Sequence, residues 1–299
     1  MGTTYSISIY DYQVNLDTLK YKIDSLLNNI NLQMSTYIKN SEISKINKGK
    51  SGNYEVSEDF LKVVDKALAY YKINNRYDIT IKPLVDLWGF GTSKEFKIPD
   101  SSKITDVLQY VGSEKILIQN NQIVKLDNNV EIDLSSIAKG FAVDKVSDFL
   151  SNSSYINHTV EIGGEMRTSG YKNNENWNIG ILSPLDNKLV HTVKIHNKSL
   201  ATSGTYNNFF TIRDVDYSHL INPLTGYPIK HNVKSVSVIA NNCIDADALA
   251  TLVIINENPY DAIKLINKIE SVDVMILLLD DDEKVIKILS DNFTDYIIN

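Results

Sequence analysis

The chain has 299 residues, of which 43% are hydrophobic and 22% are charged, a composition that is sufficient for a large buried core. Its formal net charge of −7 and its pI near 5.3 argue against nonspecific binding to nucleic acid or to an anionic membrane surface. The single cysteine, Cys243, excludes an internal disulfide and a cysteine-rich metal site, and no apolar stretch reaches the roughly 18 residues of a membrane-spanning helix.

Helices and strands are expected to be mixed along the chain. Apolar residues at alternate positions predict a first strand at residues 4–10, and helical spacing predicts helices at 16–34 and after Ser57. Further strands are predicted at 115–118, 123–126, 158–162, 177–182, 189–195, 209–212 and 233–239, with a last pair around the acidic turn 280–283. Further helices are predicted at 137–150, 245–255 and 259–269. Because no repeat or Pro/Gly-rich linker interrupts the sequence, we expect one α+β domain over residues 1–299, with mixed or antiparallel sheets and packed helices.

Residues 241–255, NNCIDADALATLVII, predict a helix with one oxygen-rich face. Asp245 is expected to cap this helix, and Asp247 and Thr251 are four residues apart, so their side-chain oxygens would share a face. A carboxylate, a hydroxyl and a neighbouring carbonyl make a hard oxygen site, which suits magnesium or calcium better than zinc. Taken alone, such residues are more often a solvated helix face or a cap.

Residues 131–150, EIDLSSIAKGFAVDKVSDFL, predict a strand that ends near Leu134, a small polar turn and an amphipathic helix. Free amides at a helix start can bind an anion. Lys139 would add a positive charge, and Gly140 would allow close approach of another backbone. The stretch lacks a full glycine fingerprint, so a plain capped helix explains it equally well.

Three shorter segments combine turn residues with polar side chains. EIGGE at 161–165 and ATSGTY at 201–206 are predicted as tight turns after apolar strands. SHLINPLTG at 218–226 places His219 on a strand that leads into an Asn-Pro turn. His219 is the best candidate for a general base among the five histidines, although a lone histidine is more often structural.

Eight motifs, taken together and in this order, resemble those of the ApbE family of FAD:protein FMN transferases. They are MGTTYSI at 1–7, MSTYIKNSEISKIN at 34–47, YDITIKPLVDLWGFG at 77–91, IDLSSIAKGFAVD at 132–144, EIGGE, ATSGTY, SHLINPLTG, and ADALAT at 246–251. Collinear matches are far more specific than single ones, so the structural explanations of the individual motifs lose most of their weight. The resemblance implies an ApbE-like, T-fold-related architecture, either undivided or with two subdomains around an FAD cleft.

The resemblance also implies a set of site residues. Magnesium would be bound by the side chains of Asp247 and Thr251 and by the backbone carbonyls of Ala138 and Ala250. FAD would be contacted by Met1, Tyr37, Tyr77, Asp78, Ser135, Lys139, Phe141, Thr202 and Ile221. His219 stands at the position of the family's proposed base. The rings of Tyr37, Tyr77 and Trp88 offer flat apolar surfaces that suit stacking on the flavin. Core packing is the alternative, and it is favoured for Trp88 and disfavoured for Tyr37.

Neutral residues replace charged ones at three places in the family pattern. Asn222 stands for the usual Asp before Pro223, Leu224 stands for a common Arg, and an arginine pair is replaced by Asn207 and Asn208. These replacements weaken any requirement for charge at those positions. Because Asn has the shape of Asp, we expect the geometry around Asn222 to be retained.

The implied activity is magnesium-dependent transfer of FMN from FAD to a Thr or Ser hydroxyl of an acceptor protein, with release of AMP. Two alternatives stay open: a magnesium-dependent pyrophosphatase that makes FMN and AMP, and an FAD-binding protein without turnover. The implied partners are FAD and an acceptor such as a redox-pump subunit or a reductase, with no nucleic acid. Family members usually work outside the cytoplasmic membrane, often membrane-associated, but this sequence shows neither a signal peptide nor a lipobox.

Overall fold

The computed structural model describes residues 2–10, 12–186, 188–205, 209–213 and 215–298. The chain divides into two compact units. Unit 1 comprises Met1–Leu27, Lys139–Tyr206 and His231–Asn299, and unit 2 comprises Asn28–Ala138 and Asn207–Lys230. None of the described helices combines the length and the apolar character that a bilayer crossing requires.

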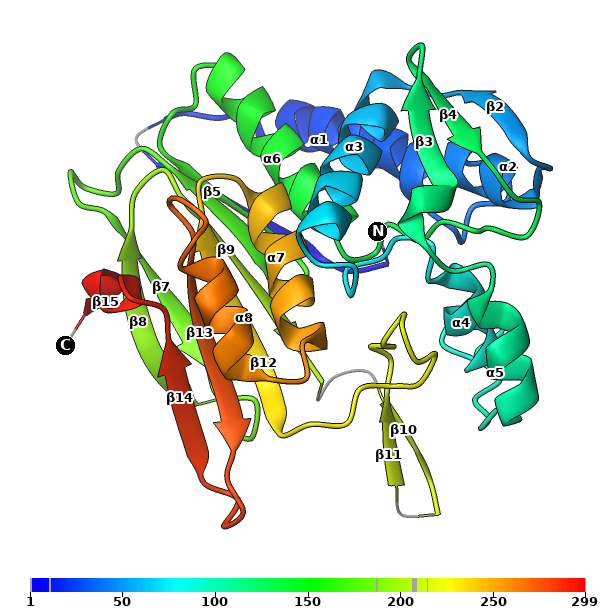
Figure 1. Cartoon of the computed structure of the whole chain (residues 1–299). Coiled ribbons are helices and arrows are strands. Elements are labelled where there is room, and N and C mark those ends of the chain that lie inside the picture. The colour runs from blue at the N-terminus through cyan, green and yellow to red at the C-terminus, as the bar shows by residue number, and fades with distance from the viewer. Residues whose placement is uncertain (1, 11, 187, 206–208, 214, 299) are drawn as a thin grey trace. The chain divides into compact units, whose positions relative to one another are not determined.

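Unit 1 is built on a seven-stranded sheet in which every neighbouring pair is antiparallel (Figure 1). The spatial order is β1 (Tyr5–Ile9), β5 (His158–Ile162), β6 (Glu165–Ser169), β9 (Ser199–Gly204), β12 (Val233–Ala240), β13 (Asp273–Leu279) and β14 (Val285–Leu289). The central strand β12 is buried along most of its length because both faces of the sheet are covered.

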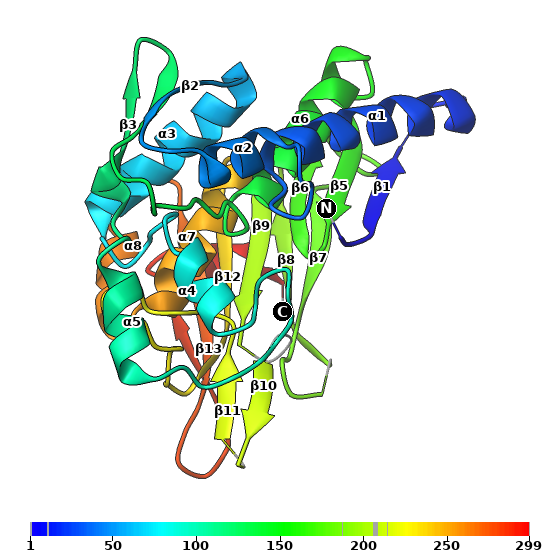
Figure 2. The same ribbon diagram turned by 90° about the vertical axis from the view of Figure 1, so that its right-hand side faces the viewer.

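Helices cover one face of this sheet (Figures 1 and 2). They are α6 (Ala138–Asn152), α7 (Cys243–Ile255) and α8 (Pro259–Ile266). Helix α7 packs on β6, β9 and β12, and α8 packs on β13 and β14. Every residue of α7 except Asp245 is buried, so any polar side chain on this helix needs a partner inside the protein.

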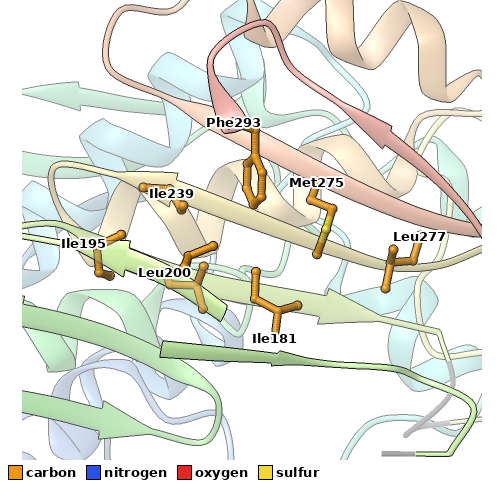
Figure 3. Close-up of a cluster of buried hydrophobic side chains, with 8 residues drawn as sticks. Ile181, Ile195, Leu200, Ile239, Met275, Leu277 and Phe293 are labelled. Carbon is orange, nitrogen blue, oxygen red and sulfur yellow. The ribbon is translucent and has the colours of Figure 1, made fainter. Parts of the chain in front are cut away.

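A three-stranded sheet covers the other face. Its order is β15 (Ile297–Ile298), β8 (Leu189–Ile195) and β7 (Trp177–Leu182), and the 3-10 helix η2 (Phe293–Tyr296) precedes β15. Figure 3 shows the apolar core that joins the two sheets, formed by Ile181, Ile195, Leu200, Ile239, Met275, Leu277 and Phe293. This core fixes the strands that carry helix α7 on their opposite face.

Unit 2 combines short helices with two small sheets. Its elements are α2 (Glu42–Lys48), β2 (Gly52–Glu55), α3 (Glu58–Ile73), α4 (Lys82–Leu87), α5 (Ser101–Leu108), η1 (Ser113–Lys115), β3 (Ile116–Gln119), β4 (Gln122–Lys125), β10 (Phe209–Ile212) and β11 (Val215–Ser218). Strands β2, β4 and β3 pair in that order, and β10 pairs with β11. The division between the units falls inside α1 (Leu16–Met34).

The strongly periodic segments have the predicted structure, and the α+β class is confirmed. Helix α1 and strands β5, β7, β8 and β10 have the predicted bounds. Ser57 caps α3, since its Oγ accepts a 3.3 Å hydrogen bond from the Phe60 amide.

Two local predictions are wrong. Residues 201–204 are the end of strand β9, where Ser203 faces α7 and its Oγ lies 3.4 Å from Oγ1 of Thr251. Residues 130–134 form no strand. Ile132 instead exchanges hydrogen bonds of 2.7 and 2.8 Å with the side chain of Asn47, and Asp133 donates its amide to the Ile79 carbonyl at 2.7 Å. The backbone groups of this segment therefore form their hydrogen bonds without a neighbouring strand.

Candidate functional site

Helices α6 and α7 approach each other closely at Gly140. The Gly140 amide donates a 2.8 Å hydrogen bond to Oδ2 of Asp247. A Cβ atom at position 140 would lie 2.3 Å from the Cys243 carbonyl oxygen and 2.7 Å from Cβ of Asp247. Glycine is therefore required for the two helices to hold the Asp247 carboxylate against the start of α6.

Three charged side chains gather beside this contact. The ammonium of Lys139 is paired with Oε1 of Glu165, the first residue of β6. Glu165 is only 2% exposed, and its Oε2 has no hydrogen-bond partner within the described part of the chain. Asp247 is 3% exposed. Two buried carboxyl groups thus lie beside one ammonium, so the cluster carries a net negative charge when both are ionised.

The pKa shifts in this cluster report the same imbalance. Burial, and then the charge of Asp247, raise the pKa of Glu165 despite the opposing effect of Lys139. Burial also raises the pKa of Asp247, against the effects of Lys139 and the Gly140 amide. Burial by itself would lower the pKa of Lys139, but Asp247 and Glu165 raise it above its usual value. A cation placed here would stabilise both carboxylates in their charged form.

The oxygen donors around Asp247 fit a hard divalent cation. Thr251 lies one turn after Asp247 on the same helix, and Ala250 is buried beside it. Among the described residues, no cluster of three or more His, Cys, Asp or Glu side chains could hold a metal. A metal at Asp247 would therefore need hydroxyl and backbone oxygens as further ligands, which is the set that magnesium accepts. The fourth predicted ligand, Ala138, is the first residue of α6.

Helix α7 is not capped as predicted. Asn242 occupies the N-cap position without a capping side-chain hydrogen bond, and Asp245 lies inside the first turn. The first two amides of the helix are instead bound by Asp144 of α6. The capping role of Asp144 is not evident from the sequence because a capping residue normally lies next to its own helix, and Asp144 lies on another one.

Two of the predicted FAD-contacting residues already use polar groups in hydrogen bonds within the protein. The Ser135 amide donates a 2.7 Å hydrogen bond to Oδ1 of Asp133, so this amide is already bound. The carboxylate of Asp78 accepts four hydrogen bonds of 2.6–3.1 Å, from the amides and hydroxyls of Thr80 and Ser113. Burial nevertheless raises the pKa of Asp78. Asp78 therefore organises the loops around it.

The candidate aromatic residues differ in exposure. Tyr37 is 67% exposed, whereas Tyr77 is 1% exposed and Trp88 is fully buried. The Tyr77 ring packs edge-on against Tyr70, and its hydroxyl accepts a 3.0 Å hydrogen bond from Ser136. Core packing of Trp88 is confirmed, since its indole also donates to the Gly226 carbonyl at 2.8 Å. Of the three rings, that of Tyr37 is accessible for stacking, whereas those of Tyr77 and Trp88 are packed in the core.

The remaining predicted FAD contacts lie in different settings. Phe141 and Ile221 are buried. Oγ1 of Thr202 lies 2.8 Å from Oγ of Ser237 on the neighbouring strand. Because successive side chains of a strand point to opposite faces, Thr202 points away from α7 while Ser203 points toward it. Met1, Asn207 and Asn208 lie outside the described residues.

His219 lies directly after β11 rather than within it. Its ring contacts that of Phe90 edge-on, with 6.4 Å between the centroids. The following turn is held by Asn222, whose Oδ1 accepts a 2.9 Å hydrogen bond from the Leu224 amide and whose carbonyl accepts one of 2.8 Å from Gly226. The hydrogen bond from the Leu224 amide requires only an acceptor oxygen on residue 222, which Asn and Asp both provide.

The chain is similar to known flavin transferases over nearly its whole length. A sequence model of the ApbE family matches residues 1–276. The FAD:protein FMN transferase of Vibrio cholerae is 38% identical over 293 residues, which cover 95% of this chain and 87% of that protein. The FAD:protein FMN transferase of Haemophilus influenzae is 36% identical over 267 residues, covering 84% and 77%.

Two solved structures have the same fold. The flavin transferase ApbE from Vibrio cholerae superimposes with a TM-score of 0.89 at 34% identity, covering 99% of this chain and 96% of that one. The ApbE protein from Thermotoga maritima also has a TM-score of 0.89, at 29% identity and with coverage of 100% and 97%.

Proposed function

The chain belongs to the ApbE family, and on this premise we propose that it transfers the FMN part of FAD to an acceptor protein. The observation that carries the proposal is the buried Asp247 carboxylate, bound at Oδ2 by the Gly140 amide next to the Lys139 and Glu165 pair. The oxygen donors of this site, and the net negative charge that it carries when both carboxyl groups are ionised, support a magnesium ion there. An acidic protein needs such a cation to bind a pyrophosphate.

The reaction that we propose joins a Thr or Ser hydroxyl to FMN. The hydroxyl oxygen attacks the FMN-side phosphorus, the bond from that phosphorus to the bridging oxygen breaks, and AMP leaves with the electron pair. The products are a protein–FMN phosphoester and AMP. The hydroxyl proton passes to a ring nitrogen of His219, a role that is worth roughly 10²- to 10⁴-fold in rate.

The residues around Asp247 prepare the site for the substrate phosphates. Magnesium would be bound by Asp247 and Thr251 with the carbonyls of Ala138 and Ala250, and the chemistry it supplies is stabilisation of negative charge on the pyrophosphate. The Gly140 amide holds one oxygen of Asp247, which leaves the other for a ligand. Glu165 keeps the Lys139 ammonium in place, and Asp247 together with Glu165 raises the pKa of Lys139.

We assign the FAD contacts from the positions that match the family motifs, and each assignment is a proposal. Tyr37 would stack through its exposed ring. Tyr77 and Asp78 would make contact through their backbones, since their side chains are engaged. The other proposed contacts are made by Met1, Ser135, Lys139, Phe141, Thr202 and Ile221. The acceptor that this activity serves would be a flavin-bearing redox-pump subunit or a reductase.

One incubation distinguishes the proposed transferase from its two alternatives. The protein is mixed with FAD and Mg²⁺, with and without an acceptor domain that carries a Thr in a family-type target motif, and FMN, AMP and flavinylated acceptor are quantified. Transfer predicts AMP and flavinylated acceptor in equal amounts, with little FAD consumed when the acceptor is absent. Equal production of FMN and AMP without acceptor would indicate a pyrophosphatase, and intact FAD in both samples would indicate a binding protein.

The Asp247→Ala variant tests the metal site in the same assay. We expect loss of Mg²⁺-dependent turnover and of calorimetric Mg²⁺ binding, in a protein that stays folded by circular dichroism. Unchanged Mg²⁺ affinity in this variant would show that the metal binds elsewhere.

A further inference from the structure

Helix α7 receives its N-terminal cap from another helix. The carboxylate of Asp144, on α6, accepts hydrogen bonds of 2.9 Å from the amide of Cys243 and of 2.9 Å from the amide of Ile244. These are the first two residues of α7, and both are buried. The residue at the N-cap position, Asn242, offers no side-chain bond to these amides. Asp144 thus binds amides that have no partner within their own helix.

The Asp144 cap and the candidate metal ligand Asp247 belong to the same pair of contacts between α6 and α7. Gly140 and Asp144 are one turn apart on α6, and their partners Cys243 and Asp247 are one turn apart on α7. The Gly140 amide binds Asp247 at one point, and Asp144 binds the Cys243 amide at the other. Two contacts one turn apart determine both the distance between the helices and the rotation of α7 about its axis. That rotation decides where the oxygens of Asp247 and Thr251 point.

Arg167 completes the arrangement from strand β6. Its Nη1 lies 2.8 Å from Oδ1 of Asp144 and 3.3 Å from Oδ1 of Asp148. The side chain of Asp144 is 11% exposed, whereas that of Asp148 is 57% exposed. Arg167 therefore orients the buried carboxylate that caps α7 and compensates its charge.

We propose that Asp144 is a positioning residue for the metal site: by capping α7 from α6 it sets the orientation in which Asp247 and Thr251 present their oxygens to a divalent cation. Asp144 itself contacts neither the metal nor the substrate in this role. The proposal rests on the proposed function, because it assumes that Asp247 is a metal ligand.

The decisive variant is Asp144→Asn, with Asp148→Asn as its matched control. An asparagine can accept through one oxygen only, so its NH₂ group would face one of the two α7 amides and that amide would lose its partner. Asp148→Asn neutralises the other carboxylate beside Arg167 and leaves the cap intact. The probe is Mg²⁺ alone, titrated by calorimetry without FAD, together with hydrogen exchange of the α7 amides.

We expect Asp144→Asn to weaken Mg²⁺ binding by roughly 10- to 100-fold, the usual effect of removing a group that orients a metal ligand. Exchange of the Cys243 and Ile244 amides should accelerate, whereas Asp148→Asn should stay within about twofold of wild type for both measurements. With acceptor present, saturating Mg²⁺ should restore most of kcat in Asp144→Asn, as expected when the variant loses metal affinity and keeps its catalytic groups.

A folded Asp144→Asn protein with wild-type Mg²⁺ affinity would overturn the proposal. If this variant does not fold, Arg167→Met decides, because it removes the 2.8 Å ion pair that orients the Asp144 carboxylate toward the two α7 amides. We expect a loss of about threefold or more in Mg²⁺ affinity for Arg167→Met, and an unchanged affinity would overturn the proposal. The Asp247→Ala variant distinguishes failure of the proposed metal site from failure of the proposed role of Asp144. If Asp247→Ala leaves Mg²⁺ binding intact, the metal site itself is wrong. If Asp247→Ala abolishes Mg²⁺ binding and the Asp144 and Arg167 variants do not weaken it, only the role of Asp144 is wrong.

Discussion

Replacing Gly140 with Ala is expected to force α6 and α7 apart and to weaken the candidate metal site. The new methyl group would stand 2.3 Å from the Cys243 carbonyl oxygen, and ordinary contact begins at 3.4 Å. The helices would have to separate by about 1 Å, since backbone on both sides leaves no flexible side chain to move. A shift of that size also breaks the 2.8 Å bond between the Gly140 amide and Asp247.

Three effects set the magnitude. Alanine is better than glycine in a helix by about 1 kcal/mol. Overpacking costs about 1–3 kcal/mol. Loss of the hydrogen bond to a buried carboxylate costs about 1.5–3 kcal/mol. The steric and hydrogen-bonding losses exceed the gain in helix propensity, so the free energy of unfolding should fall by about 1.5–5 kcal/mol. This is a large share of the roughly 5–15 kcal/mol of a typical domain.

Urea unfolding of wild type and Gly140→Ala, each with and without Mg²⁺, measures this effect. Gly180→Ala is the matched control, since its methyl group would meet only Cδ1 of Leu189, the end of a flexible side chain, at 2.9 Å. We expect Gly180→Ala to change stability by less than about 1 kcal/mol. Gly140→Ala should lose the stabilisation that Mg²⁺ confers on wild type. If Gly140→Ala were as stable as wild type or more so, helix propensity would dominate and the reasoning from close approach would be refuted.

Three further outcomes follow from single residues. His219→Ala should lower single-turnover transfer by roughly 10²- to 10⁴-fold with little change in FAD affinity, and near-normal transfer would remove His219 from the role of base. Tyr37→Ala should weaken FAD binding while the melting temperature stays nearly constant, because the ring is 67% exposed; a large stability loss with normal FAD affinity would indicate packing instead. Burial lowers the pKa of His158, so the imidazole takes up a proton in the unfolded chain at a higher pH than in the folded protein. As pH falls below about 6.5, the free energy of unfolding should therefore drop by up to about 1.4 kcal/mol per pH unit, until the folded-state pKa is reached. Urea unfolding of wild type and His158→Gln across this range checks the sign, and equal slopes for the two proteins would contradict the assignment.

Elements whose pattern is local could be predicted from the amino-acid sequence. Helix α1 and strands β5, β7 and β8 have the predicted bounds because periods of 3.6 and 2 residues are read within one segment. The family could also be predicted from the sequence, since eight motifs in a fixed order are specific even where each one is weak. Where a motif consisted of small residues the local pattern was ambiguous, and residues 201–204 were predicted as a turn although they belong to β9.

The contacts that hold the candidate site together could not be predicted from the sequence. Gly140 binds Asp247 across 107 residues, and Asp144 caps an amide 99 residues away. Lys139 pairs with Glu165 across 26 residues, and Tyr77 is buried against Tyr70 rather than offered to a ligand. None of these pairings can be predicted from the spacing of residues within one segment. Which carboxylate meets which amide depends on how α6, α7 and β6 pack, and that packing is decided by burial and shape over the whole unit.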